Sequence, residues 1–157
     1  MRSFTRREFN KLLTIGIIMP SSLLITPHFS VAEMQCRCLD PNCERKHSPD
    51  LDADFMKMLE ELRMATFALR ISSGARCLAH DSEVSPKKNK KGGVHVQGIA
   101  ADILVGHLPT SEVLRLTKTA TSIGFTGYGF ALANKNRAKR FIHIDSRSST
   151  GGAIWSY

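Results

Sequence analysis

Three residues that suit a metal ion stand far apart in this sequence, and one site can use them only if the fold brings them together. The segment 95–102 reads HVQGIAAD and contains His95 and Asp102, whereas His143 follows much later. Seven fully extended residues span more than about 20 Å, so the chain must fold back between His95 and Asp102. Gly98 permits this fold-back because glycine adopts positive φ angles without steric cost.

The side chains of His95, Asp102 and His143 suit a catalytic zinc ion. Zinc accepts imidazole nitrogen and carboxylate oxygen, and three protein ligands leave the fourth position for water, whose pKa falls to about 7. His143 and Asp145 share one face of a strand because side chains alternate with period two. Only one of these two needs to reach the metal, and the other can orient a ligand from behind. We therefore predict Zn²⁺ as the cofactor.

The hydrophobic pattern predicts a small single domain of the α+β class. A helix is expected after Asp50 or Asp52, either of which can cap it, because apolar residues follow at helical spacing: Phe55, Met58, Leu59 and Leu62. A second helix is expected from Thr110, as its cap, to Gly124. Strands are expected at 68–72, 99–105, 125–130 and 141–145, with surface loops at 81–93 and 134–140. Single helices between strands favour a mainly antiparallel sheet packed with helices.

The first 32 residues have the three parts of an export signal. A basic start precedes an uncharged stretch at 12–26 that is too short for a membrane span, and Ser30 and Ala32 predict cleavage after Ala32. The segment 5–11 (TRREFNK) resembles the twin-arginine export motif, with a general secretory signal as the alternative. Either signal predicts an exported protein of the periplasm or cell envelope, with no stable membrane span after cleavage.

The cysteines define the next segment of the chain, residues 33–50, ahead of the main domain at 51–157. An even number of cysteines in an exported protein favours disulfides, and three pairings are open. The alternative is a second metal site, but the C-x-C-x4-C spacing lacks the paired C-x2-C of common zinc modules. Disulfides would attach this segment to the later loop that carries the last cysteine. The four residues are Cys36, Cys38, Cys43 and Cys77.

Three segments taken in order, SGAR at 73–76, HVQGIAAD at 95–102 and HID at 143–145, resemble the zinc D-Ala-D-Ala peptidases and the related hedgehog-type domains. The resemblance covers residues 51–157. It implies a hedgehog/DD-peptidase-like fold and a zinc metallopeptidase acting on peptidoglycan, with zinc on His95, Asp102 and His143. The family position matching Arg76 contacts the substrate near the scissile bond, where a guanidinium can bind a carboxylate or stabilise an oxyanion.

Two departures from the family pattern affect the expected chemistry. Gly93 stands where many members have serine, and Arg140 replaces the acidic general base that several members carry. A zinc peptidase needs a proton acceptor, so Asp145, His80 or Asp81 is expected to supply the base, and we take Arg76 and Asp145 as the catalytic candidates.

The expected function is hydrolysis of murein stem peptides or cross-links, as a DD-carboxypeptidase or an endopeptidase. The alternatives are a non-catalytic zinc-containing domain that binds the cell wall and a disulfide-rich adaptor without metal. The formal net charge of +8 favours anionic partners. We expect peptidoglycan and the twin-arginine export machinery as partners and no nucleic acid, while the oligomeric state stays open. The run at 87–91 is expected to be a solvated loop.

Overall fold

A computed structural model of the chain describes residues 24–85, 92–148 and 152–157. The helices are α2 (Val31–Met34), α3 (Glu44–His47), α4 (Ala53–Ala65), α5 (Leu78–Val84), α6 (Thr110–Ile123) and the 3₁₀ helix η2 (Arg137–Lys139). The strands are β1 (Leu24–Thr26), β2 (Phe29–Ser30), β3 (Ile71–Ser73), β4 (Ala100–Leu104), β5 (Gly127–Ala131), β6 (Phe141–Asp145) and β7 (Ala153–Ser156).

The main sheet has five strands in the order β3-β4-β6-β5-β7. All neighbouring strands run antiparallel except β7, which runs parallel to β5. The predicted α+β class with a mainly antiparallel sheet is confirmed. The strand expected at 68–72 is displaced to β3, and β7 was not predicted from the sequence.

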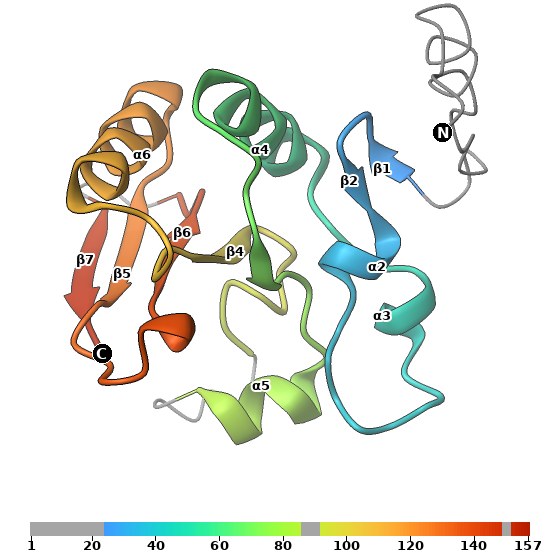
Figure 1. Cartoon of the computed structure of the whole chain (residues 1–157). Coiled ribbons are helices and arrows are strands. Elements are labelled where there is room, and N and C mark those ends of the chain that lie inside the picture. The colour runs from blue at the N-terminus through green and yellow to red at the C-terminus, as the bar shows by residue number, and fades with distance from the viewer. Residues whose placement is uncertain (1–23, 86–91, 149–151) are drawn as a thin grey trace, which may run out of the picture.

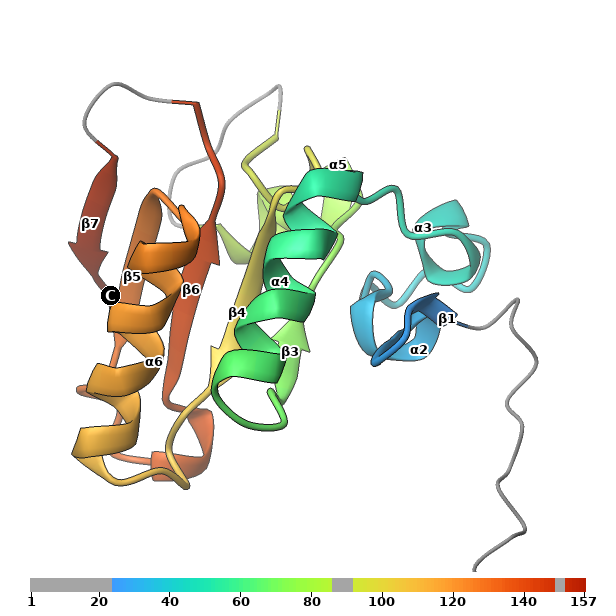
Figure 2. The ribbon, with the colours of Figure 1, turned by 90° about the horizontal axis from the view of Figure 1, so that it is seen from above.

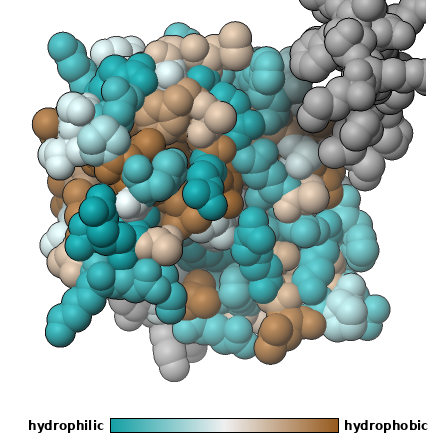
Figure 3. Space-filling view, viewed as in Figure 1, coloured by the Kyte–Doolittle hydropathy of each residue, from teal (hydrophilic) through white to brown (hydrophobic). Residues whose placement is uncertain are grey.

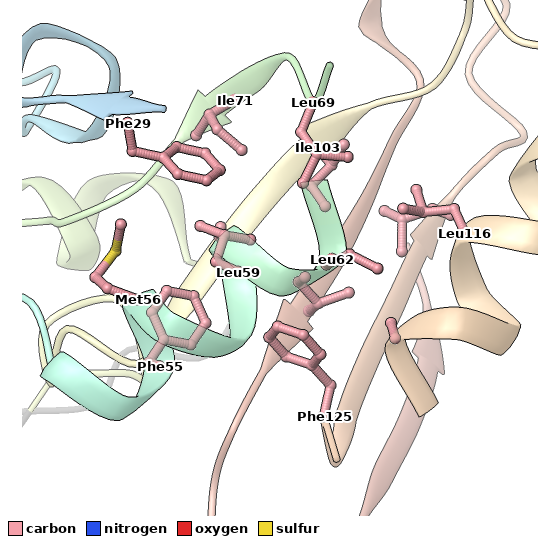
Figure 4. Close-up of a cluster of buried hydrophobic side chains, with 14 of the residues drawn as sticks. Phe29, Phe55, Met56, Leu59, Leu62, Leu69, Ile71, Ile103, Leu116 and Phe125 are labelled. Atoms are coloured by element: carbon pink, nitrogen blue, oxygen red, sulfur yellow. The ribbon is translucent and has the colours of Figure 1, made fainter. Parts of the chain in front are cut away.

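Helices α4 and α6 lie side by side on one face of this sheet, and α5 lies on the other (Figures 1 and 2). Helix α4 begins where the Asp52 carboxylate accepts a hydrogen bond from the backbone N–H of Phe55 at 2.8 Å. Its apolar stripe packs against the sheet in the core of Figure 4, where Leu59 and Leu62 are fully buried with Ile103. Full burial of each such side chain contributes about 1.5–3 kcal/mol.

Helix α6 has the predicted bounds but not the predicted cap. Thr110 is its first helical residue and Pro109 is the N-cap, without a side-chain hydrogen bond. Gly124 ends the helix in the left-handed region at φ +117°, and its N–H bonds to the carbonyl of Ala120.

The loop expected at 81–93 is wrong in its first part, because residues up to Val84 belong to α5. The Cys77 sulfur accepts from the N–H of His80 at the start of this helix. Asp81 is buried and accepts from the distant Gly93 N–H at 2.8 Å, so a tertiary contact supports a helix that lacks an apolar stripe. The lysine run at 87–91 lies outside the described residues.

Residues 24–34 form a β1–β2 hairpin followed by α2, which packs against the main domain. Phe29 and Met34 are fully buried in the core, and the Arg63 guanidinium lies 3.7 Å from the centroid of the Phe29 ring. The expected cleavage after Ala32 would fall inside α2 and separate Phe29 from this core.

No helix in the described part of the chain is long and apolar enough to cross a bilayer. Figure 3 shows that hydrophilic residues cover much of one face of the molecule, with hydrophobic residues among them.

Candidate metal centre

Two neighbouring strands place the carboxylate and one imidazole of the predicted site. Asp102 in β4 and His143 in β6 are direct partners in the antiparallel register. Their strand neighbours Ile103, Ile142 and Ile144 belong to the apolar core under the helices. Because side chains alternate along a strand, Asp102 and His143 lie on the opposite face of the sheet.

His95 reaches the same place from the turn that precedes β4. Gly98 has φ +75°, and its N–H bonds to the carbonyl of His95 at 3.3 Å, which closes the predicted fold-back. A Cβ on Gly98 would lie 2.3 Å from the Asp50 carbonyl oxygen, so the close approach as well as the positive φ requires glycine.

The three side chains converge as a zinc site requires. His143 Nδ1 lies 2.9 Å from Asp102 Oδ1 and 3.1 Å from His95 Nε2, and the third separation, His95 Nε2 to Asp102 Oδ1, is 3.3 Å. Tetrahedral zinc with ligands at about 2.0–2.1 Å holds those ligands about 3.3 Å apart. The residues therefore fit one zinc ion, and the three predicted ligands come together as one group.

Hydrogen bonds behind the imidazoles set which nitrogen faces the metal. His95 Nδ1 lies 2.7 Å from the Gly74 carbonyl oxygen and His143 Nε2 lies 2.9 Å from Asp145 Oδ2, and both of these oxygens can only accept a hydrogen bond. Each of these nitrogens therefore carries the hydrogen. The lone pairs of His95 Nε2 and His143 Nδ1 are left for the metal.

Asp102 uses its two oxygens for different partners. Oδ1 faces the imidazoles, while Oδ2 accepts from Arg76 Nη2 at 2.7 Å. Burial alone would raise the pKa of the Asp102 carboxyl, but the adjacent His95 and His143 hold it well below its usual range. The site thus contains an ionised carboxylate ready to bind a cation.

The pKa of His143 is shifted in the opposite direction from that of Asp102. Burial lowers the pKa of its imidazole, but the hydrogen bonds to Asp102 and Asp145 outweigh burial and leave the pKa above its ordinary value. An imidazole binds metal only when the coordinating nitrogen is deprotonated, so metal and proton compete for His143.

A protein-family profile described as Peptidase M15 matches residues 27–145 of this chain. The chain belongs to the peptidase M15 family. Peptidases of this family are metallopeptidase hydrolases and are zinc-dependent in general, which agrees with the donor set of His95, Asp102 and His143. No curated protein sequence matches the chain.

In this M15 peptidase, Asp145 lies behind His143 and not at the metal-facing atoms. Its side chain is fully buried, and besides His143 it accepts from Arg147 Nε at 2.7 Å and from the backbone N–H of Arg147 at 3.1 Å. Gly127 in β5 makes room for it, since a Cβ there would lie 2.1 Å from Asp145 Oδ2. Asp145 is therefore placed to orient His143, one of the two roles that the sequence left open for this pair.

Arg76 lies against Asp102, one of the three candidate zinc ligands of the M15 peptidase. Besides Asp102 it bonds through Nε to Ser73 Oγ at 2.9 Å and through Nη1 to Asp81 Oδ1 at 3.4 Å, and its side chain is 13% exposed. The guanidinium thus neutralises Asp102 on the side away from the imidazoles. Its small exposed fraction is the part available to a substrate.

The two other candidates for a general base differ in their partners. Asp81 is occupied, since it accepts from Ser85 Oγ at 3.0 Å in addition to Gly93 and Arg76. His80 Nδ1 is buried without a hydrogen-bond partner in the described part of the chain, and Glu83 Oε2 lies 3.8 Å from it. Arg140, at the position of the missing acid, donates to the carbonyl of Asn134 at 2.8 Å.

Sequence reasoning missed the aromatic residues that border the M15 metal site. The Trp155 ring lies 5.1 Å from the His143 ring, and the Tyr157 ring lies 6.2 Å from that of Trp155. Burial and then the negative charge of Asp102 raise the pKa of Tyr157, so its hydroxyl keeps its proton at neutral pH. A Cβ on Gly129 would lie 2.6 Å from the Trp155 ring. The small-aromatic-small run GYG at 127–129 was the available signal for this contact.

The cysteines of the M15 peptidase form no disulfide, and all four lie in the described part of the chain. The disulfides expected from the sequence are therefore not found. The sulfurs nevertheless gather at one place that joins the N-terminal segment to the loop at Cys77, as expected for that segment.

Proposed function

We propose that this M15 metallopeptidase hydrolyses peptide bonds in peptidoglycan, at the stem peptides or their cross-links. The observation that carries the proposal is the convergence of His95, Asp102 and His143 within 3.3 Å of one another, each with a partner that fixes its orientation. Zinc bound there would polarise the scissile carbonyl and lower the pKa of a water molecule. The resemblance of the SGAR, HVQGIAAD and HID segments to D-Ala-D-Ala peptidases supports peptidoglycan as the substrate.

Two further side chains, Asp145 and Arg76, have separate roles in the proposed site. Asp145 holds the proton on His143 Nε2, and Arg76 balances the charge of Asp102. We propose that the exposed part of the Arg76 guanidinium binds a substrate carboxylate or the developing oxyanion. The neutral Tyr157 hydroxyl is a second candidate donor, since its pKa stays above the ordinary value.

A site outside the cytoplasm belongs to the same proposal. Peptidoglycan lies beyond the inner membrane, so a chain that acts on it must be exported, and the TRREFNK segment at 5–11 supports the twin-arginine route. Positive charge on the protein favours retention near anionic wall polymers.

Digestion of purified sacculi tests this function directly. The full chain, loaded with zinc, is incubated with sacculi, and the released and remaining muropeptides are identified by mass spectrometry. Loss of a terminal D-alanine from stem peptides indicates a carboxypeptidase, whereas conversion of cross-linked dimers to monomers indicates an endopeptidase. No change in any muropeptide, with zinc bound, would refute the enzymatic proposal.

A matched pair of variants ties any activity to the site. Asp102→Asn removes the charge of a ligand and should abolish cleavage, whereas Asp54→Asn makes the same change on an exposed residue of α4 and should leave it intact.

A second candidate function is a non-catalytic domain that binds the cell wall through the same zinc fold. The observation that favours it is Arg140, which stands in place of the acidic base and binds the Asn134 carbonyl. Sedimentation of the protein with sacculi without any turnover supports this candidate.

A further inference from the structure

The second cluster of metal-binding atoms lies apart from the His95, Asp102 and His143 site and has no part in the proposed reaction. The sulfur atoms of its four cysteines all lie within 4.8 Å of one another. Two of the residues are buried, with exposed fractions of 1% for Cys36 and 8% for Cys43. The cluster consists of Cys36, Cys38, Cys43 and Cys77, and we call it the thiol cluster.

We propose that the thiol cluster binds a structural Zn²⁺ ion through all four cysteines. Zinc with four thiolate ligands at about 2.3 Å holds the sulfurs about 3.8 Å apart, so the observed spacing needs only a small contraction. Four protein ligands leave no position for water, which distinguishes this closed site from the three-ligand catalytic one. Binding converts four thiols to thiolates and releases their protons to solvent.

Backbone contacts assemble the cluster from both sides. The Cys36 N–H bonds to the Arg45 carbonyl at 2.9 Å, which brings Cys36 back beside the chain that follows Cys43. The N–H of Cys77 points at Cys36 Sγ at 3.4 Å, and the N–H of His80 points at Cys77 Sγ at the same distance. Donors aimed at sulfur stabilise the thiolate form that zinc requires.

Disulfides are the competing use of the same four residues. Each disulfide bonds only two sulfurs, at about 2.05 Å, and would split the cluster into two pairs. None of the four cysteines forms a disulfide, and their sulfurs all lie within 4.8 Å of one another, so one ion could bind all four together. The geometry therefore favours the metal.

The proposed ion would hold the loop that serves the catalytic site. Cys77 directly follows Arg76, whose guanidinium binds Asp102, and the Ala75 N–H bonds to the Met34 carbonyl at 2.9 Å. A Cβ on Gly74 would lie 2.6 Å from that same carbonyl, so the loop and the N-terminal segment are in close contact. A metal at the thiol cluster fixes both at once.

Metal content and cobalt spectroscopy test the proposal without reference to activity. The full chain is purified without reductant or chelator, and its zinc is measured against protein concentration. We expect about two zinc ions per chain in the wild type, and about one in both His95→Ala/His143→Ala and Cys38→Ser/Cys43→Ser. Cobalt substitution should give thiolate-to-metal charge-transfer absorption in the wild type and in the histidine variant, and none in the cysteine variant.

The spectrum of the histidine variant keeps the test decisive even if the cysteine variant fails to fold. Loss of all zinc in the histidine variant would overturn the proposal. So would thiols that react with a thiol reagent only after reduction, since that result assigns the cysteines to disulfides. The outcome is independent of the proposed function, because failure to cleave muropeptides leaves the zinc count unchanged.

Discussion

Replacement of Asp145 by asparagine should weaken zinc binding at the site of His95, Asp102 and His143 by about 10- to 100-fold. The two oxygens of Asp145 accept from His143 Nε2, from two nitrogens of the Arg147 guanidinium and from the Arg147 backbone. Asparagine keeps one of these oxygens and turns the other into a donor. In place of Oδ2 the new donor faces both His143 Nε2 and Arg147 Nη2, and in place of Oδ1 it faces Arg147 Nε and the Arg147 backbone N–H. Arg147 loses its charged partner in either case, and His143 loses the carboxylate that orients it.

The expected loss corresponds to about 1.4–2.7 kcal/mol of zinc-binding free energy. Competition with a chromogenic chelator measures this loss in the wild type and the variant under the same conditions. Asp54→Asn is the control, because it makes the same chemical change on a side chain that is 84% exposed. Equal zinc affinity in the Asp145 variant and the wild type would refute the orienting role of Asp145.

Three further perturbations probe other parts of the structure. Phe29→Ala should lower the free energy of unfolding by about 3–5 kcal/mol in chemical denaturation, because Phe29 is fully buried; a loss below 1 kcal/mol would show that residues 24–32 are dispensable. Glu60→Gln should lower the free energy of unfolding at neutral pH. Burial raises the pKa of Glu60, but the hydrogen bonds to His28 and Thr26 outweigh burial and hold this pKa below 4.5. The wild type therefore loses the stability that the Glu60 carboxylate contributes as pH falls through the lowered pKa, and the difference in unfolding free energy between the two proteins should vanish in acid. Gly129→Ala should displace Trp155, the single tryptophan, and an unchanged fluorescence spectrum would contradict the close contact.

Much of the site was predictable because the spacing of residues close in sequence determines which side chains share a strand face and where the chain turns. The alternation of β6 predicts that His143 and Asp145 share a face of the strand. In the structure the two side chains lie on that face and are joined by a hydrogen bond. Gly98 predicts the fold-back, which its φ of +75° confirms. Strand alternation alone could not divide the roles of His143 and Asp145, which only the family resemblance separated, because that division depends on Gly127 and Arg147, which meet Asp145 only in the folded sheet.

The elements that sequence reasoning missed depend on distant partners. Helix α5 leaves Leu78 and Val84 exposed, so it has no apolar stripe and relies on the buried Asp81. Strand β7 depends on parallel pairing with β5, and no local sequence pattern predicts this pairing. Residues 24–30 were assigned to the export signal at 1–32, because the same apolar composition serves both an export signal and a buried hairpin.

The loop at 73–77 contacts both the candidate catalytic site and the thiol cluster. Its Gly74 carbonyl orients His95, its Arg76 binds Asp102, and its Cys77 belongs to the thiol cluster. We predict that an ion at the thiol cluster, by stiffening this loop, favours zinc at the catalytic ligands. Because coupling between two binding sites is reciprocal, zinc at the catalytic site must strengthen metal binding at the thiol cluster by the same factor. Equal affinities of each site with the other empty or filled would show that the loop transmits nothing between them.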